Sequence, residues 1–313
     1  MTETTQAMNE PMRSYMDVGL IHFMAFPETM GGDGPILETL KKIAVDPYFS
    51  AVAVSWIKDP EIRKQACRML QLAQMRVVYG AHPSLLSQSL NPNDLDEKRR
   101  QNAVDELKKG IDEAYEIGAE SFVFLSREYT SEEIDQSLTK LIDSTRELCN
   151  YAKSKGELKI LLEVFDHEVD KKSLIGPAAL AKRYSEEVCK DFENFGLVVD
   201  LSHIPIIGET NEEAILPVQS HLAAADIGNC LLSDTSSPRY GDHHPWFAFP
   251  GGENGVEELT KFLKILLDIE FLNKENPPIV SFEVKPMEDD DPDVVIANAK
   301  RTLDRAWARL YRD

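Results

Sequence analysis

Two stretches, Leu161-Leu-Glu-Val-Phe-Asp166 and Leu197-Val-Val-Asp-Leu-Ser-His203, carry the pattern that decides the fold. Each begins as a short apolar run and ends in acidic side chains, and each stands between longer amphipathic segments. Apolar runs of this length are typical of strands that are buried on both faces, as in a parallel sheet covered by helices. The two stretches therefore predict an α/β protein with polar residues at the carboxyl ends of its strands.

The same alternation extends from residue 17 to the end of the chain. Short apolar runs are predicted as strands over Val18–Phe23, Ala51–Trp56, Arg76–Gly80, Ser121–Leu125, Lys159–Val164, Gly196–Asp200, Ala224–Cys230 and Pro278–Val284. Amphipathic stretches separate them, among them 99–117, which Gly118 is expected to end. A helical segment between consecutive strands favours parallel pairing. Eight such units in 313 residues is the size of a TIM barrel.

The main alternative is an open, doubly wound sheet with a small second domain. The nucleotide-binding signatures of such sheets, GxGxxG and GxxxxGK[ST], do not follow the first predicted strand. No linker rich in Pro, Gly or Ser interrupts the middle of the chain. We therefore expect a single-domain (β/α)8 TIM barrel over residues 15–313, preceded by a flexible polar tail over residues 1–14.

Composition and charge exclude several classes of function and several kinds of partner. The chain has 34 Lys and Arg against 54 Asp and Glu, a net charge of -20, which disfavours nucleic acids and anionic membranes as partners because both attract basic surfaces. Its 4 cysteines lack CxxC spacing, so neither a disulfide framework nor a thiolate zinc site is expected. No apolar stretch reaches the ~20 residues of a membrane span, and no secretory signal is visible. We expect a soluble cytoplasmic protein.

Acidic residues lie at or near the ends of the last four predicted strands: Glu163, Asp200, Asp226 and Glu283. The carboxyl ends of barrel strands form the active-site face, so these carboxylates would converge and repel one another. A buried carboxylate is costly unless it is paired or bound to a cation, and a divalent metal is the simplest way to stabilise several together. The alternative, that single acids cap helices or pair with basic neighbours, stays open, chiefly for Asp226.

Other polar residues are candidates for substrate binding. His203 stands three residues after Asp200. The long segment Arg239-Tyr-Gly-Asp-His-His-Pro-Trp-Phe247, followed by Pro250-Gly-Gly-Glu-Asn254, is rich in glycine, proline and aromatic residues, as functional loops often are. Its aromatic, histidine and arginine side chains suit a polyhydroxylated substrate, although a surface loop or subunit contact is the alternative. The candidates are His22, His82, Arg239, His244, Trp246 and Lys285.

Taken together, these residues resemble the sugar phosphate isomerase/epimerase family, the xylose isomerase-like TIM barrels that include ketose 3-epimerases. The resemblance spans essentially the whole chain and rests on Leu162-Glu-Val164, Asp200-Leu-Ser-His203, Ile227-Gly-Asn229, Pro250-Gly-Gly252 and Phe282-Glu-Val-Lys285. It implies one divalent metal, Mn²⁺ or Mg²⁺ foremost and Zn²⁺ or Co²⁺ as alternatives, held by Glu163, Asp200, Asp226 and Glu283. Asp226 stands where the family usually has histidine, and His221 or His243 are the alternative nitrogen donors.

The resemblance also implies a reaction, the isomerisation or epimerisation of a sugar or sugar acid through a metal-stabilised enediolate. Glu163 and Glu283 would remove and return the proton on opposite faces of the substrate, and His203 would hydrogen-bond a substrate oxygen. A metal-dependent lyase or decarboxylase acting on a 3-oxo sugar or sugar acid, and a degenerate barrel that binds sugar without turnover, are the alternatives. A phosphodiesterase related to endonuclease IV is disfavoured, because 7 histidines and a net charge of -20 fit neither its three-metal cluster nor a DNA groove. Relatives are commonly homodimers or homotetramers.

Overall fold

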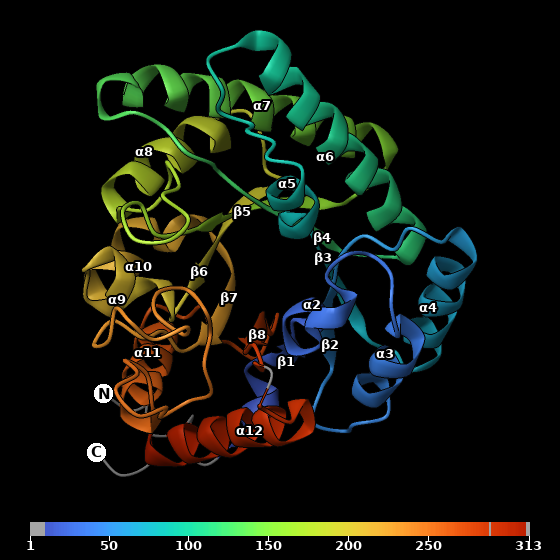
Figure 1. Cartoon of the computed structure of the whole chain (residues 1–313), viewed down its shortest axis with the longest axis vertical. Coiled ribbons are helices and arrows are strands. Elements are labelled where there is room, and N and C mark those ends of the chain that lie inside the picture. The colour runs from blue at the N-terminus through green and yellow to red at the C-terminus, as the bar shows by residue number, and fades with distance from the viewer. Residues whose placement is uncertain (1–9, 288, 311–313) are drawn as a thin grey trace.

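The computed structural model describes residues 10–287 and 289–310, which form a barrel of parallel strands surrounded by helices (Figure 1). The 8 strands lie in the order β1-β8-β7-β6-β5-β4-β3-β2. Their bounds are β1 (Asp17–Leu20), β2 (Ala51–Val54), β3 (Arg76–Gly80), β4 (Ser121–Leu125), β5 (Lys159–Val164), β6 (Phe195–Asp200), β7 (Leu222–Gly228) and β8 (Ile279–Glu283). Every ladder is parallel. The prediction of a single-domain TIM barrel is confirmed.

The barrel closes between β1 and β2. Within the described residues these two strands share an isolated parallel bridge, Ile21 with Ala53, rather than a ladder. The Ser50 amide also donates to the Val18 carbonyl at 3.0 Å. The first strand is shorter than the predicted Val18–Phe23, because the chain turns into a short helix at His22. An uninterrupted apolar run does not reveal where a strand gives way to a buried helical turn.

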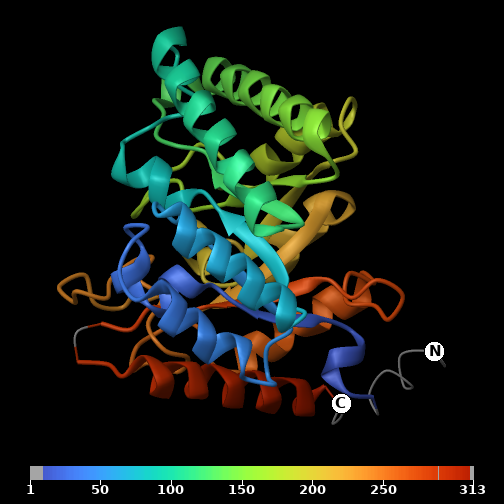
Figure 2. The ribbon, with the colours of Figure 1, turned by 90° about the vertical axis from the view of Figure 1, so that its right-hand side faces the viewer.

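Helices fill the connections between the strands, and Figure 2 shows α6 and α7 side by side at one end of the molecule and α12 at the other. Aspartate side chains at residues 59, 96 and 291 accept backbone N–H bonds at the starts of α4, α6 and α12. Gly118, in the left-handed conformation with φ 78°, ends α6 as predicted. The α-helices are α2 (His22–Ala25), α3 (Ile36–Ala44), α4 (Pro60–Leu72), α5 (His82–Ser87), α6 (Glu97–Ile117), α7 (Ile134–Lys155), α8 (Ala178–Cys189), α9 (His203–Ile207), α10 (Asn211–Ile215), α11 (Val256–Asp268) and α12 (Pro292–Arg309). Short 3₁₀ helices are η1 (Met12–Ser14), η2 (Pro27–Thr29), η3 (Ser131–Glu133) and η4 (Leu216–His221).

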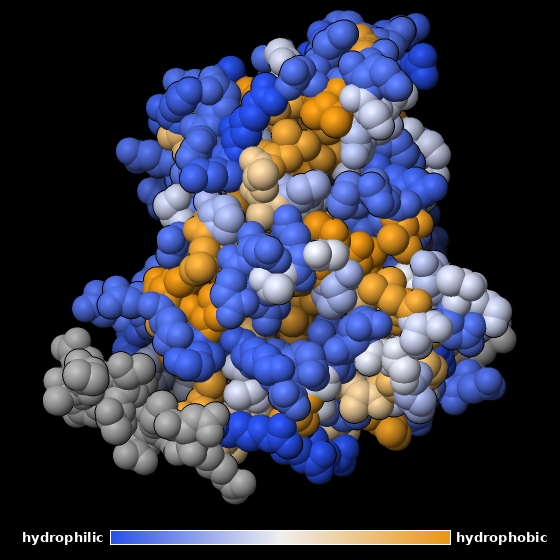
Figure 3. Space-filling view, turned by 90° about the vertical axis from the view of Figure 1, so that its left-hand side faces the viewer, coloured by the Kyte–Doolittle hydropathy of each residue, from blue (hydrophilic) through white to orange (hydrophobic). Residues whose placement is uncertain are grey.

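Two apolar layers stabilise the barrel. The larger one lies between the strands and the helices. The smaller one fills the barrel interior with side chains that include Val78, Val123, Leu161, Val198 and Ile279. Figure 3 shows one face of the molecule, on which hydrophilic side chains predominate and apolar side chains are exposed in several areas between them. In the described part of the chain, no helix combines the length and apolar character that crossing a membrane requires.

The expected N-terminal tail of residues 1–14 differs from the structure at its inner end. Residues 1–9 lie outside the described residues. Met12 is buried, and the Trp307 indole donates to the Glu10 carbonyl at 3.4 Å. Residues 10 and 12 therefore contact the folded body rather than forming part of a flexible tail.

Candidate metal centre and active site

The predicted acids lie on the inner face of the barrel because side chains alternate along a strand. In β5, Leu161 belongs to the interior layer, so Glu163 two residues later points to the same side. In β6, Val198 and Asp200 have the same relation. The ladder between β6 and β7 places Asp200 opposite Asp226. Glu163, Asp200, Asp226 and Glu283 are all buried, with relative exposures of 3%, 0%, 8% and 6%.

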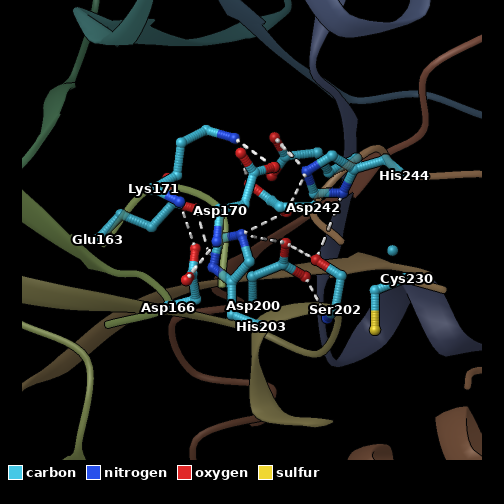
Figure 4. Close-up of polar contacts among 12 residues, drawn as sticks. Glu163, Asp166, Asp170, Lys171, Asp200, Ser202, His203, Cys230, Asp242 and His244 are labelled. Atoms are coloured by element: carbon cyan, nitrogen blue, oxygen red, sulfur yellow. Dashed lines mark hydrogen bonds and ion pairs between the residues drawn. The ribbon is translucent and has the colours of Figure 1, made fainter. Parts of the chain in front are cut away.

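The acids lie in two groups of possible ligands, one of which includes two imidazoles. Figure 4 shows Glu163, Asp200, His203 and His244 from these groups. Potential ligand atoms of Glu163, Asp226 and Glu283 lie within 4.8 Å of one another, and so do those of Asp200, His203 and His244. The two groups adjoin. His203 Nδ1 is 3.6 Å from Glu163 Oε1, and His244 Nε2 is 3.4 Å from Glu283 Oε1.

The carboxylate cluster fits a divalent cation. Glu163 Oε1 and Glu283 Oε2 are buried and have no hydrogen-bond partner among the residues that the structure describes. Burial and, after it, the negative charge of Glu163 raise the pKa of Asp226 and of Glu283 well above the ordinary values. Carboxylates this close together repel one another when all of them are ionised, and some of their buried oxygens have no hydrogen-bond partner among the described residues. A bound cation would stabilise such a group. The oxygen atoms suit Mg²⁺ or Mn²⁺, whereas nearby imidazole nitrogen suits Zn²⁺ or Co²⁺.

Asp200 is held at the end of β6 by Ser202, a residue that the sequence analysis did not single out. The Ser202 amide donates to Asp200 Oδ1 at 2.8 Å, and the Ser202 hydroxyl donates to Oδ2. The same hydroxyl oxygen lies 3.3 Å from His244 Nδ1. Serine two residues after aspartate is a common local turn pattern, and that was the available signal.

His203 has both ring nitrogens against protein oxygens. Nδ1 is 2.9 Å from the Val164 carbonyl, which can only accept, so Nδ1 carries a hydrogen. Nε2 is 3.1 Å from Asp242 Oδ1. Burial alone would lower the pKa of His203, but the carboxylates of Asp242 and Asp200 outweigh it and raise that pKa to about 10. A bond from His203 to substrate, as predicted, would therefore require a change at Asp242.

Asp242 is the central residue that the sequence analysis missed. Its Oδ1 lies 3.1 Å from His203 Nε2 and 2.8 Å from His244 Nε2, and its Oδ2 lies 2.9 Å from Lys171 Nζ. Burial acts to raise the pKa of Asp242, but the charges of His244, Lys171 and His203 hold it well below its usual range. Asp242 lies in a loop, so no strand-end pattern marks it, and the one signal was its place between Gly241 and two histidines.

Two of the predicted substrate-binding histidines join the cluster and one does not. His82 Nε2 lies 3.1 Å from Glu163 Oε2, and His244 contacts Asp242. His22 instead faces the helical layer, where Nε2 lies 2.7 Å from Thr39 Oγ1. Burial lowers the pKa of His22 to about 3, so it remains neutral.

The other candidates lie beside the cluster or away from it. The Arg239 guanidinium lies 4.9 Å from the Trp246 ring centre and binds Asp290 at 2.6 Å, so it joins two loops of the protein. The Lys285 amide donates to the His244 carbonyl at 2.9 Å. His221 precedes β7 at the opposite end of the barrel, where Nδ1 lies 2.8 Å from Ser185 Oγ. His221 is therefore too far from Asp226 to supply a nitrogen ligand in its place.

Gly228, the last residue of β7, leaves room for the site. A Cβ atom there would lie 2.5 Å from the Glu283 carbonyl oxygen and 3.1 Å from His244 Nδ1. Because a strand backbone cannot move cheaply, we expect Gly228→Ala to lower the free energy of unfolding by about 1–3 kcal/mol. Denaturant unfolding measures this. Gly31→Ala is the control, since its new Cβ would first meet the exposed Asp33 side chain at 3.3 Å. Equal midpoints for the two variants would contradict the prediction.

The fold agrees with comparisons to known proteins. Solved structures with a similar fold include a D-tagatose 3-epimerase-like protein, 18% identical, with a TM-score of 0.69 over 94% of this chain and 100% of that chain. The IOLI protein with a binding zinc atom is 16% identical, with a TM-score of 0.71 over 95% of this chain and 100% of that one. The 3-keto-D-glucoside 4-epimerase from E. coli is 16% identical, with a TM-score of 0.64 over 92% of this chain and 98% of that one.

Among curated proteins, none matches the chain in sequence. Residues 45–305 match the family described as xylose isomerase-like TIM barrel, which is most of the chain. This match agrees with the family that the strand-end motifs resemble. The chain therefore belongs to the family of xylose isomerase-like TIM barrels.

Proposed function

We propose that the protein is a divalent-metal-dependent enzyme that isomerises or epimerises a sugar or sugar acid. The observation that carries this proposal is the buried cluster of Glu163, Asp226 and Glu283, with Asp200 beside it, at the carboxyl end of the barrel strands. Active sites of TIM barrels lie at this end. Two solved structures with the same fold are named as a D-tagatose 3-epimerase-like protein and a 3-keto-D-glucoside 4-epimerase, which supports the reaction class. A third holds a zinc atom, which supports the metal.

The proposed metal ligands are the carboxylates of Glu163, Asp200, Asp226 and Glu283. A divalent cation bound there would act as a Lewis acid on a substrate carbonyl and so make the neighbouring C–H bond more acidic. The donors are mostly oxygen atoms, which favours Mn²⁺ or Mg²⁺.

Glu163 and Glu283 are proposed as the acid–base pair. Each has one buried oxygen without a hydrogen-bond partner among the described residues, Oε1 in Glu163 and Oε2 in Glu283, that can take or give a proton. Burial and then the charge of Glu163 raise the pKa of Glu283 in the metal-free protein, so this carboxylate holds a proton more tightly than an exposed glutamate does. His82 Nε2 lies 3.1 Å from Glu163 Oε2, so this imidazole borders the proposed acid–base pair.

The proposal predicts exchange of substrate hydrogen with solvent. Incubation of the purified, metal-loaded protein with a panel of ketoses, aldoses and sugar acids in D₂O should place deuterium at the reacting carbon, which NMR detects. Metal analysis of the same preparation should give about one divalent ion per chain. Loss of CO₂ or of a leaving group without epimerised sugar would instead indicate a lyase. Stoichiometric metal without exchange or cleavage on any sugar would contradict the proposed reaction.

Asp226→His tests the proposed third ligand. The imidazole would supply the nitrogen that the family usually has, and it would remove one of the mutually repelling charges that raise the pKa of Glu283. We therefore expect roughly tenfold tighter Zn²⁺ binding by calorimetry, because imidazole suits Zn²⁺ better than carboxylate does. Asp234→His, in the loop that follows β7, is the control. Unchanged affinity would show that residue 226 is not a ligand.

A further inference from the structure

The loop between β5 and α8 is fixed by a single buried carboxylate. Asp166 Oδ1 accepts the amide hydrogens of Val169 at 2.7 Å and Asp170 at 2.8 Å, and Oδ2 accepts that of Lys171 at 2.7 Å. Asp166 is fully buried, and bonds to a charged acceptor are stronger than neutral ones. The loop is also joined to the end of β4, because the Leu174 amide donates to the Arg127 carbonyl at 3.1 Å. The backbone that carries Lys171 is therefore held at several points.

Lys171 joins this loop to the loop that follows β7 (Figure 4). Its Nζ lies 2.9 Å from Asp242 Oδ2 and 3.2 Å from Asp170 Oδ2. Burial alone would lower the pKa of Lys171, but the charges of Asp242 and Asp170 outweigh it and raise that pKa. The ammonium is therefore a permanent charge at this place. Gly241, which lies beside Asp170, has φ 85°, a left-handed backbone conformation that glycine adopts without strain.

The two oxygens of Asp242 have separate partners. Oδ2 is taken by the ammonium, whereas Oδ1 faces Nε2 of His203 at 3.1 Å and Nε2 of His244 at 2.8 Å. The orientation of this one carboxylate therefore sets the contact that each imidazole makes through its Nε2 atom. Those imidazoles stand within 3.6 Å of Glu163 and 3.4 Å of Glu283.

We propose that Lys171 is a positioning residue, which holds Oδ2 of Asp242 so that Oδ1 keeps the imidazoles of His203 and His244 beside the two glutamates. Without the ammonium, Oδ2 is a buried charged atom without that partner, and the carboxylate turns to find another. One imidazole is then drawn out of place. The proposal rests on the proposed function only for its kinetic readout, because the arrangement of the rings can be observed directly.

Lys171→Met tests the proposal, since methionine is unbranched and apolar and removes the charge. We expect the Nε2 resonances of His203 and His244, observed by ¹H–¹⁵N NMR, to shift in the variant. We expect kcat for sugar exchange to fall about tenfold or more, and KM to change less than threefold. Lys171→Arg, which keeps the charge, should restore part of the loss. Lys172→Met is the control, because Lys172 is the next residue of the same loop and its side chain is exposed.

The outcomes separate this proposal from the proposed function. Unshifted histidine resonances in Lys171→Met, or equal shifts in Lys172→Met, would overturn it. Shifted resonances in a protein that acts on no sugar would support the positioning role while removing the proposed reaction. If Lys171→Met does not fold, Asp166→Asn decides, because it keeps the ammonium but weakens the bonds that place it. A shift of the same two resonances away from their wild-type positions would then support the proposal, and unchanged resonances would overturn it.

Discussion

Glu283→Gln is expected to lower kcat for proton exchange roughly a hundredfold to ten-thousandfold, the range over which general acid–base groups contribute. The amide keeps the size of the side chain but cannot carry a proton to and from the substrate. Glu283 is 6% exposed, and its Oε2 has no hydrogen-bond partner in the described part of the chain. No described group therefore hydrogen-bonds to this oxygen and could transfer the proton in its place. Exchange into deuterated solvent measures the loss.

The same substitution should leave the metal-free protein at least as stable as the wild type at neutral pH. Burial and the charge of Glu163 raise the pKa of Glu283, so the folded state holds this proton more tightly than the unfolded state does. The contribution of Glu283 to the stability of the metal-free wild type therefore falls as the pH rises above about 4.3, the ordinary glutamate value. Glutamine has no such penalty. Denaturant unfolding in EDTA at neutral pH compares the two proteins.

Glu275→Gln is the matched control for Glu283→Gln. Glu275 is exposed and precedes β8 at the far end of the same strand, so its substitution should change neither turnover nor stability. Full activity in Glu283→Gln would remove Glu283 from the mechanism. A large loss of stability in that variant would show that its carboxylate is held by favourable contacts rather than repelled.

The fold was predictable because buried strands leave a direct trace in the sequence. The bounds of β3, β4 and β5 agree with the predicted ones. The error at β1 arose because Ile21, Phe23 and Met24 continue the apolar pattern into α2, whose side chains fill the barrel interior. Hydrophobicity reports burial there, not the backbone conformation.

The strand-end acids were predictable for the same reason, because alternation fixes which side of the barrel they face. The partners of these acids were not. Asp242 and Lys171 lie 71 positions apart in loops, and their 2.9 Å contact depends on how two loops approach over the barrel. His22 shows the opposite limit. It follows a strand as His82 does, yet its ring lies against Thr39 rather than the acids. A position at the end of a strand makes a residue a candidate for the site, but the packing of its side chain determines whether it reaches the acids.

Metal binding should raise the thermal stability of the protein. A ligand that binds only the folded state adds about 2.7–4.1 kcal/mol at concentrations 100 to 1,000 times its Kd. We therefore expect the Tm to rise by several degrees when Mn²⁺ is added to EDTA-treated protein, and to fall again when EDTA is restored. The physical source is the relief of repulsion among Glu163, Asp226 and Glu283. Equal Tm values with and without Mn²⁺, Mg²⁺, Co²⁺ and Zn²⁺ at millimolar concentration would contradict the metal site.

Glu163→Gln should remove most of this stabilisation by metal. After burial, the charge of Glu163 is the largest cause of the raised pKa of both Asp226 and Glu283, so Glu163 contributes most to the field that attracts a cation. In its absence the other two carboxylates ionise more readily, and the metal-free protein should become more stable while its Tm responds little to Mn²⁺. A glutamate that served only as a base would leave the response to Mn²⁺ intact. The thermal shift therefore separates metal binding from catalysis at Glu163, which loss of turnover alone does not.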